Sequence, residues 1–349
     1  MKAIVFNAQG EPATLAERNV PDPGPNEVLV KVSTTALNPH DQKIKDLGLL
    51  IKEWPWIPGS DVAGTVEKLG PDVTKYQVGD RVFGQGNFLS PRVLDFAGLQ
   101  EYALVDDRCS AKVPPGLSDD DATTMPTNAA TAFFGFFANS GFALPVSSLG
   151  GKAEFDASSH DLVVLGGSSQ LGKLIIQFAK VMGWRSVVVT AGPQNTDSLK
   201  QLGATHVVSR HGNFDDMVRQ IRDVVGDDDL QYCFNVMHSD RTLGAALLSG
   251  SGGGSGHLAN FVHGTVDYAR AGKKEADFED TFVQGMTLLY PELGRYFWDH
   301  LPTWLVDGSL KVPKWSVIEG LDVTKVNEVL DKWKDQEPVP DHPHVHPNA

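Results

Sequence analysis

From about Asp161 onward, segments typical of strands alternate with segments typical of helices. A valine-rich run at 162–166 precedes a helical pattern at 171–182, and further pairs follow up to a strand-like segment at 257–262. Continuous apolar runs are typical of strands that are buried on both faces of a parallel sheet, where each helix forms the crossover to the next strand. The alternation predicts a doubly wound α/β domain with a parallel sheet of about six strands, the usual size for this architecture.

The chain before about Ala130 follows a different pattern, with short apolar runs between Gly and Pro, as at 28–32 and 62–66. This pattern predicts a β-rich first domain. The 349 residues also exceed the roughly 250–300 residues at which single cores stop growing. We expect boundaries at 1–135, 136–280 and 281–349, where the last segment returns to the first domain. Its end, Asp341–Ala349, holds three histidines among Pro and Asp and predicts a flexible, solvated tail.

The composition narrows the classes of partner and compartment. With 30 Lys and Arg against 44 Asp and Glu, the net charge is −14, which opposes binding to nucleic acid and to anionic membranes. No stretch approaches about 20 consecutive apolar residues, and the opening MKAIV resembles a first strand. Cys109 and Cys233 lie far apart, so neither a disulfide framework nor a cysteine-rich zinc site is expected. These features predict a cytoplasmic protein.

A glycine-rich turn joins the first strand and helix of the α/β half, in the string VVLGGSSQLGKL at 163–174. Glycines let the backbone turn tightly and approach a pyrophosphate, and the helix N-terminus behind them offers amide donors to the anion. The alternative is a plain tight turn, because serines replace the middle glycine of the usual pattern. The predicted cofactor loop consists of Gly166, Gly167, Ser168, Ser169, Gln170, Leu171 and Gly172.

The second strand of this half indicates which nicotinamide cofactor would bind. NAD enzymes usually have an acidic residue at the end of that strand, which binds the ribose hydroxyls, but here the strand ends in Thr190, Ala191 and Gly192. Thr190, Lys200 and Arg210 would instead suit a 2'-phosphate. The sequence therefore predicts NADPH, although each cation alone is equally compatible with an ordinary solvated charge.

Three strings in the first half, NPHDQK at 38–43, PGSDVAG at 58–64 and VGDRVF at 78–83, precede this loop. In this order they resemble the medium-chain dehydrogenase/reductase superfamily, in its zinc-free branch of quinone oxidoreductases and enoyl reductases. The resemblance extends to about residue 335 and is strongest to the fungal trans-acting enoyl reductases that serve polyketide synthases. It implies a GroES-like catalytic domain followed by a Rossmann domain.

The resemblance also bears on metal binding. Zinc-dependent members hold their catalytic metal with a Cys in the first string and a His in the second, where this chain has Asn38 and Ser60. Neither side chain is a thiolate or an imidazole, the ligands that zinc favours. We therefore expect no metal site, and hydrogen-bond donors must polarise the substrate.

The resemblance implies roles for four residues of the first 135. Lys43 would donate to the enolate oxygen that forms during conjugate reduction, and Asp41 would orient Lys43 or pair with it. Asn38 would hydrogen-bond the ribose or the substrate, and Thr131 would approach the nicotinamide. In the alternative interpretation Lys43 is simply solvated and Asp41 caps a turn, as Asp61 would. His40 is a weaker candidate acid.

Together these features predict an NADPH-dependent reductase of an activated C=C bond in an enoyl thioester, an enone or a quinone. A role in secondary metabolism would require a polyketide synthase as a partner in trans, because no carrier or synthase domain is recognisable in the sequence. Two alternatives remain open at this point. One is a redox-neutral enzyme on the same fold, and the other is a non-catalytic NADPH-binding protein.

Overall fold

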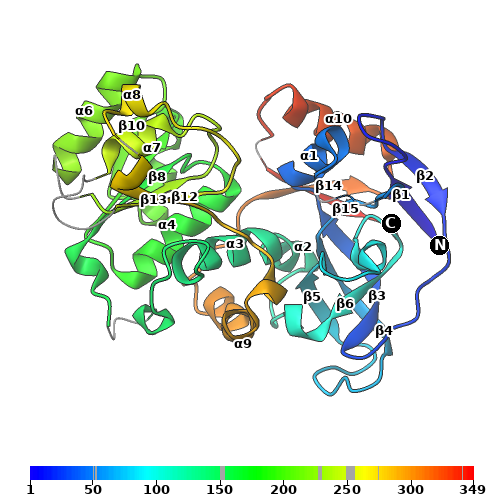
Figure 1. The fold of residues 1–349 in the computed structure, drawn as a ribbon. Coiled ribbons are helices and arrows are strands. Elements are labelled where there is room, and N and C mark those ends of the chain that lie inside the picture. Colours follow the sequence, from blue (N-terminus) through cyan, green and yellow to red (C-terminus); the bar gives the residue numbers. More distant parts are fainter. Residues whose placement is uncertain are drawn as a thin grey trace. The chain divides into compact units, whose positions relative to one another are not determined.

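The computed structural model describes residues 1–49, 51, 53–149, 154–226, 230–248, 256–273, 275–339 and 341–349. The chain divides into two compact units (Figure 1). The β-rich unit consists of Met1–Thr127, Met286–Asp307 and Val312–Ala349, and the α/β unit consists of Asn128–Gly285 and Gly308–Lys311. The units therefore divide after Thr127 and Gly285, whereas the sequence places the boundaries after residues 135 and 280. The difference after Thr127 arises because the helix that contains this boundary packs on the α/β core, where Phe133 lies 6.1 Å from Phe178 between ring centroids.

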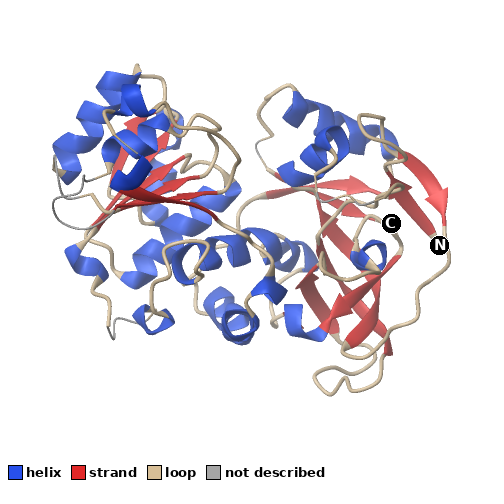
Figure 2. Cartoon of the chain, viewed as in Figure 1, coloured by secondary structure: helices blue, strands red, loops and turns tan. Residues whose placement is uncertain are grey.

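The α/β unit contains a parallel sheet with helices packed around it (Figure 2). In the described residues this sheet has six strands in the order β10-β9-β8-β11-β12-β13. The strands are β8 (Asp161–Leu165), β9 (Ser186–Ala191), β10 (His206–Ser209), β11 (Tyr232–Asn235), β12 (Gly256–Asn260) and β13 (Phe278–Phe282). The helices are α3 (Pro126–Phe137), α4 (Gln170–Met182), α5 (Thr196–Leu202), α6 (Phe214–Val225), α7 (Thr242–Leu247) and α8 (Tyr268–Ala271).

This order confirms the doubly wound fold that the alternation predicts. All five residues of β8 are buried, as expected for a strand covered on both faces. The strand order reverses beside β8, which has β9 on one side and β11 on the other. In such sheets ligands bind beyond the carboxyl ends of the strands at this reversal. None of the helices in the described part of the chain is long and apolar enough to cross a membrane.

The β-rich unit contains a larger sheet, which in the described residues has seven strands in the order β14-β15-β3-β4-β5-β7, with β6 paired to β3. Strands β1 and β2 form a separate antiparallel pair. The strands are β1 (Lys2–Val5), β2 (Thr14–Glu17), β3 (Glu27–Ala36), β4 (Asp61–Leu69), β5 (Arg81–Gln85), β6 (Tyr102–Asp106), β7 (Ser110–Lys112), β14 (Trp315–Glu319) and β15 (His342–His346). The helices are α1 (Pro39–Leu47), α2 (Asp119–Thr123), α9 (Pro291–Val306) and α10 (Val323–Lys334).

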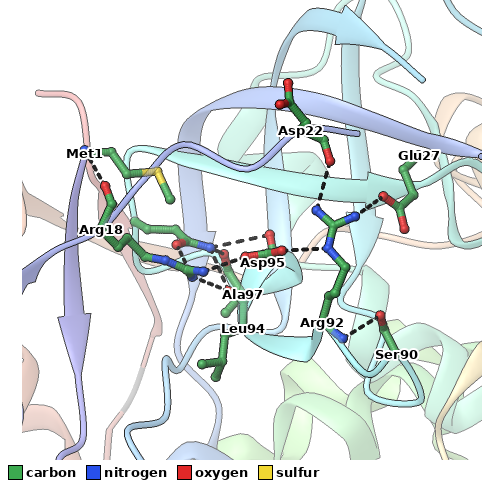
Figure 3. A network of polar contacts seen from close by, with 10 residues as sticks. Met1, Arg18, Asp22, Glu27, Ser90, Arg92, Leu94, Asp95 and Ala97 are labelled. Carbon is green, nitrogen blue, oxygen red and sulfur yellow. Dashed lines mark hydrogen bonds and ion pairs between the residues drawn. The ribbon is translucent and has the colours of Figure 1, made fainter. Parts of the chain in front are cut away.

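A network of two arginines around Asp95 fixes the segment that precedes β6 (Figure 3). Arg18 binds the Asp95 carboxylate and donates to the Leu94 carbonyl at 2.9 Å. Arg92 donates to the other Asp95 oxygen at 2.9 Å and to the Asp22 carbonyl at 2.8 Å. The network holds Val93–Phe96, a 3₁₀ turn, beside the candidate site described below.

The structure contradicts the prediction of a flexible C-terminal tail. His342–His346 forms β15, which pairs in parallel with β14 and antiparallel with β3. Alternation along the strand places the three histidines on one face and Val345, which is fully buried, on the other. The C-terminus of the chain therefore forms a strand of the β-rich unit, and its sequence is rich in histidine rather than in apolar residues.

Asp120 on α2 explains how these histidines are tolerated in a buried strand. Its carboxylate accepts hydrogen bonds from His344 Nδ1 at 2.8 Å, from His346 Nε2 at 2.9 Å and from the Thr34 hydroxyl at 3.1 Å. Burial by itself would raise the pKa of Asp120, but the two imidazole donors outweigh it and lower the pKa to about 2. Asp120 therefore links α2, β3 and β15.

We expect the substitution Asp120→Asn to lower the free energy of unfolding at neutral pH by about 2 kcal/mol, since one pKa unit corresponds to about 1.4 kcal/mol. Because the pKa is lower in the folded state, this stability is present above the ordinary aspartate range and is lost as the pH falls towards about 2. Urea denaturation between pH 7 and pH 2 measures it. Asp22→Asn, which removes an exposed ion pair to Lys68, is the control and should change little. Equal stability of Asp120→Asn and wild type at neutral pH would contradict the prediction.

Candidate active site

The N-terminus of α1 brings two of the predicted residues together. Asn38 precedes the helix, and Pro39 occupies its first turn, where its missing N–H costs nothing. The Asp41 carboxylate accepts hydrogen bonds from the Asn38 amide at 2.7 Å and from the Gly59 amide at 3.1 Å. Both side chains are buried. Asp41 thus joins the start of α1 to the turn before β4.

Lys43 lies on the next turn of α1 and is half-buried. Burial lowers the pKa of its ammonium group from the ordinary lysine value. Within the described residues its side chain makes no hydrogen bond or ion pair, so the predicted pairing with Asp41 is not formed, because both Asp41 oxygens are engaged by backbone amides. A partly desolvated ammonium group that has no hydrogen-bond or ion-pair partner among the described residues is suited to binding an anionic group.

Asp61, at the start of β4, is the central side chain of this region. It is fully buried, and its carboxylate accepts from Asn38 Nδ2 and from the Thr127 amide, each at 2.6 Å. Burial raises the pKa of Asp61 to about 6, although these donors and His40 oppose the rise. The sequence offers only a weak signal for this residue, because an acid that begins an apolar strand after Pro-Gly-Ser by itself favours a turn residue.

Ser60 connects this buried carboxyl region to a histidine. Its hydroxyl lies 3.1 Å from His40 Nε2 and 3.2 Å from the Thr127 hydroxyl. Asn38 and Ser60, which occupy the positions of metal ligands in zinc-dependent relatives, are both engaged in hydrogen bonds. Across the described ranges, no group of three His, Cys, Asp or Glu side chains could hold a metal ion.

A small pocket opens beside Ser60 and is flanked by aromatic rings. Phe88 stacks on Trp56 at 6.5 Å between centroids and meets the His40 ring edge to face at 5.9 Å. The enclosed space of about 10 Å³ would hold roughly one water molecule. The pocket is lined by Asp41, Trp56, Ile57, Gly59, Ser60, Gly86, Asn87, Phe88, Val93, Phe96 and Ala97.

In the α/β unit the glycine-rich turn forms a close-packed loop after β8. Gly166 has a φ of +102°, in the region that favours glycine. A Cβ atom on Gly167 would lie 2.8 Å from Val189 Cβ, and one on Gly172 would lie 2.4 Å from the Gly166 carbonyl oxygen. Only glycine fits at these positions without displacement of the backbone, which is the packing expected of a phosphate-binding loop.

The other residues of the loop fix its junction with α4. The Ser169 hydroxyl accepts from the Gly172 amide at 2.9 Å and donates to the Gly166 carbonyl at 3.0 Å, so Ser169 caps the helix. Ser168 and Leu171 are half-buried. Among the residues that the structure describes, Gln170 Oε1 is buried without a hydrogen-bond partner. The unsatisfied amide oxygen and the glycine cradle are both compatible with a bound dinucleotide at this loop.

The three residues predicted for the 2'-phosphate lie at the end of β9, on the helix α5 that follows it, and directly after β10. The Thr190 hydroxyl accepts from the Gly166 amide at 3.0 Å, so its first role is to hold the glycine loop against β9. Lys200 is exposed on α5, and Arg210 is exposed directly after β10. Burial lowers the pKa of His238, which follows β11, and the charge of Arg210 contributes to this lowering. Arg210 is thus a cation at the carboxyl edge of the sheet.

Thr131 belongs to the α/β unit, on α3, whereas the other three residues of the predicted catalytic set belong to the β-rich unit. A Cβ atom on Gly285 would come within 2.0 Å of the Thr131 hydroxyl, so the chain passes very close to this residue. The described contacts therefore group Asn38 and Asp41 with Asp61, and group Thr190 with the glycine loop.

Two family models match the chain. The alcohol dehydrogenase GroES-like domain matches residues 24–115, and the zinc-binding dehydrogenase model matches residues 171–290. Among curated proteins, the trans-enoyl reductase tazE of Aspergillus terreus is 31% identical over 231 residues, which are 65% of this chain and 73% of that protein. The enoyl reductase component lovC of lovastatin nonaketide synthase, also from Aspergillus terreus, is 34% identical over 52% of this chain and 48% of its own length. The match thus spans about half the length of some curated relatives.

Solved structures show the same fold. The quinone oxidoreductase of Escherichia coli, solved as a complex with NADPH, has a TM-score of 0.76 and 17% sequence identity and covers 99% of this chain and 100% of that one. The order of the two matched domains agrees with the β-rich and α/β units described above. The chain is therefore a member of the medium-chain dehydrogenase/reductase superfamily, in the branch that contains the fungal enoyl reductases.

Proposed function

We propose that this chain is an NADPH-dependent reductase of a C=C bond conjugated to a carbonyl, in an enoyl thioester, an enone or a quinone. The observation that carries the proposal is the loop after β8, where three glycines are packed too closely to bear a side chain. It lies at the carboxyl end of the central strand and in front of a capped helix, as dinucleotide loops do. The relatives named above supply the substrate class.

The residues of the loop would hold the cofactor in this proposal. The amides at the start of α4 would bind the pyrophosphate, and Thr190, Lys200 and Arg210 would meet the 2'-phosphate. NADPH supplies a hydride to the substrate. Hydride addition places negative charge on the carbonyl oxygen, and a fixed donor at that oxygen stabilises the transition state. Lys43 is the proposed donor, Asn38 would orient the substrate or the ribose, and Thr131 would approach the nicotinamide.

The test of the proposed function is oxidation of NADPH, followed by absorbance, in the presence of enones, quinones and enoyl thioesters. We expect turnover with at least one of these classes. Tight binding of NADPH without turnover of any of them would favour the redox-neutral or the non-catalytic alternative. Offering the same enoyl chain on a carrier protein and on a small thiol then tests whether a polyketide synthase is a partner in trans, as the name of lovC suggests for that relative.

The proposed preference for NADPH is testable by affinity. We expect Arg210→Ala to weaken NADPH binding by about 1.5 to 3 kcal/mol, roughly 10- to 150-fold, because hydrogen bonds to charged groups are of this strength. Lys200→Ala should act in the same direction, and NADH affinity should stay the same in both variants. Calorimetric titration measures both affinities. Arg219→Ala, which removes an exposed arginine on α6, is the control. Equal affinity of the wild type for NADH and NADPH would contradict the preference.

A further inference from the structure

A continuous line of hydrogen bonds runs from the surface of the β-rich unit to its interior. His40 Nε2 lies 3.1 Å from the Ser60 hydroxyl, and this hydroxyl lies 3.2 Å from the Thr127 hydroxyl. The Thr127 hydroxyl in turn hydrogen-bonds the Asp61 carboxyl. Each intermediate group is a hydroxyl, which can donate and accept at the same time. The line can therefore pass a proton without any movement of the backbone.

The two ends of this line have opposite exposure. Asp61 is 0% exposed, whereas the side chain of His40 is 29% exposed. The partly exposed ring of His40 lies against Phe88, which stacks on Trp56. Apolar rings beside a proton-carrying group form a surface that suits an unsaturated, weakly polar substrate. The line of hydrogen bonds from Asp61 thus ends at a partly exposed histidine that lies next to apolar rings.

The surroundings allow Asp61 to store that proton. Burial raises the pKa of its carboxyl to about 6, which places its titration near physiological pH. Three groups face the line from the elements packed around it. The Asp41 carboxylate lies 3.7 Å from His40 Nε2, Asn38 donates to Asp61, and His342 on β15 interacts electrostatically with His40. Burial lowers the pKa of His342 to about 3, so His342 is neutral in this range and does not compete for the proton.

We propose that His40 is the proton donor of the reduction and that Ser60, Thr127 and Asp61 form the relay that supplies its proton. This inference rests on the proposed function, and it assigns separate roles to two residues. Lys43 would stabilise the oxygen of the enolate, and His40 would protonate its carbon. His40 would be a catalytic residue, whereas Asp61 would act only through it.

In the proposed reduction, the C=C bond takes up one hydride and one proton. The hydride adds to the β-carbon, and the electron pair of the C=C bond moves to form the enolate. The α-carbon takes a proton from His40 Nδ1, and the new C–H bond uses the enolate electron pair. His40 Nε2 then takes a proton from Ser60, Ser60 from Thr127, and Thr127 from the Asp61 carboxyl, which becomes a carboxylate. After the product leaves, a proton from water returns along the same line through His40.

The kinetic test compares His40→Ala, Asp61→Asn and Ser60→Ala with the wild type in NADPH oxidation with an accepted enone. Loss of a general acid typically costs 10²- to 10⁴-fold, so we expect kcat to fall at least about 100-fold in His40→Ala. Added imidazole should restore part of this loss. The wild-type kcat should fall as the pH rises through about 6, because the Asp61 carboxyl then loses the proton that the relay would supply. Ser60→Ala, which interrupts the line without removing either end, should lose this pH dependence with a smaller loss of kcat.

His206→Ala is the matched control, because His206 is an exposed histidine at the amino end of β10 in the α/β unit. Near-ultraviolet circular dichroism verifies the fold of each variant. A kcat of His40→Ala close to that of the wild type, with the same pH profile, would overturn the role of His40 and leave the proposed reductase function intact.

A second measurement tests the relay without any substrate. In infrared spectra of the free protein, a protonated-carboxyl band that is absent in Asp61→Asn should disappear as the pH rises through about 6. Its midpoint should move to higher pH in His40→Ala, since His40 lowers the pKa of Asp61. A midpoint that is unchanged in both His40→Ala and Ser60→Ala would overturn the relay. If the wild type reduces no unsaturated carbonyl, the proposed function fails, and His40 is then not a proton donor of that reaction.

Discussion

Replacing Lys43 by methionine should lower kcat on an enone or an enoyl thioester about 100-fold, while the fold and the NADPH affinity stay the same. Loss of one preorganised donor at a developing oxyanion typically costs this much. Methionine approximates the unbranched apolar stem of lysine and removes the ammonium group with its charge and its N–H donors. The half-buried position of Lys43, without an ion pair in the described part of the chain, is what makes the charge available. Stopped-flow oxidation of NADPH measures the step directly.

The pH dependence of the activity provides a second test of Lys43 as the donor. The protonated form of Lys43 is the donor, and burial lowers its pKa from the ordinary lysine value. Activity should therefore fall at alkaline pH, at a lower pH than an exposed lysine would give, and this limb should be missing in Lys43→Met. Lys31→Met, at an exposed lysine on β3, is the control. An unchanged rate of hydride transfer in Lys43→Met would move the role to Asn38 or Thr131.

The substitution Gly172→Val should weaken NADPH binding up to about 100-fold. A Cβ atom at this position would lie 2.4 Å from the Gly166 carbonyl oxygen and 2.9 Å from Gly167 Cα, so the start of α4 must move away from the loop. Overpacking of this kind typically costs 1–3 kcal/mol, and about 2.8 kcal/mol corresponds to about 100-fold in affinity. Moving the helix also moves the amides that would bind the pyrophosphate. Fluorescence titration with NADPH measures the loss.

Gly183 offers a matched control at the other end of α4. It has a φ of +79°, and no atom lies within 4 Å of the position that a Cβ atom would take there. Gly183→Ala should therefore cost about 1 kcal/mol of stability through backbone strain and leave the NADPH affinity unchanged. If Gly172→Val bound NADPH as tightly as Gly183→Ala does, the loop would not be the cofactor site.

The sequence by itself determined the architecture of the α/β unit. Its strands are continuous valine-rich runs and its helices end at glycines such as Gly183, so local periodicity and local turn chemistry suffice to order them. The same locality made the glycine loop recognisable, because all its residues lie within one strand, one turn and one helix start. In the β-rich unit, the short strings around Asn38 and Pro58 identified the family, but they could not show how their side chains interact.

Those interactions were decided by the tertiary structure, because each depends on residues that are remote in the sequence. Asp61 receives hydrogen bonds from Asn38, 23 positions earlier, and from Thr127, 66 positions later. The burial of its carboxyl group therefore depends on segments that are remote in the sequence. The C-terminal strand is the clearest case. Three histidines between Pro and Asp indicate a solvated tail by local rules, yet His344 binds Asp120, which is 224 positions away. Pairing with β3 and β14 and the charge of one half-buried carboxylate outweigh the local preference, and neither can be inferred from the segment alone.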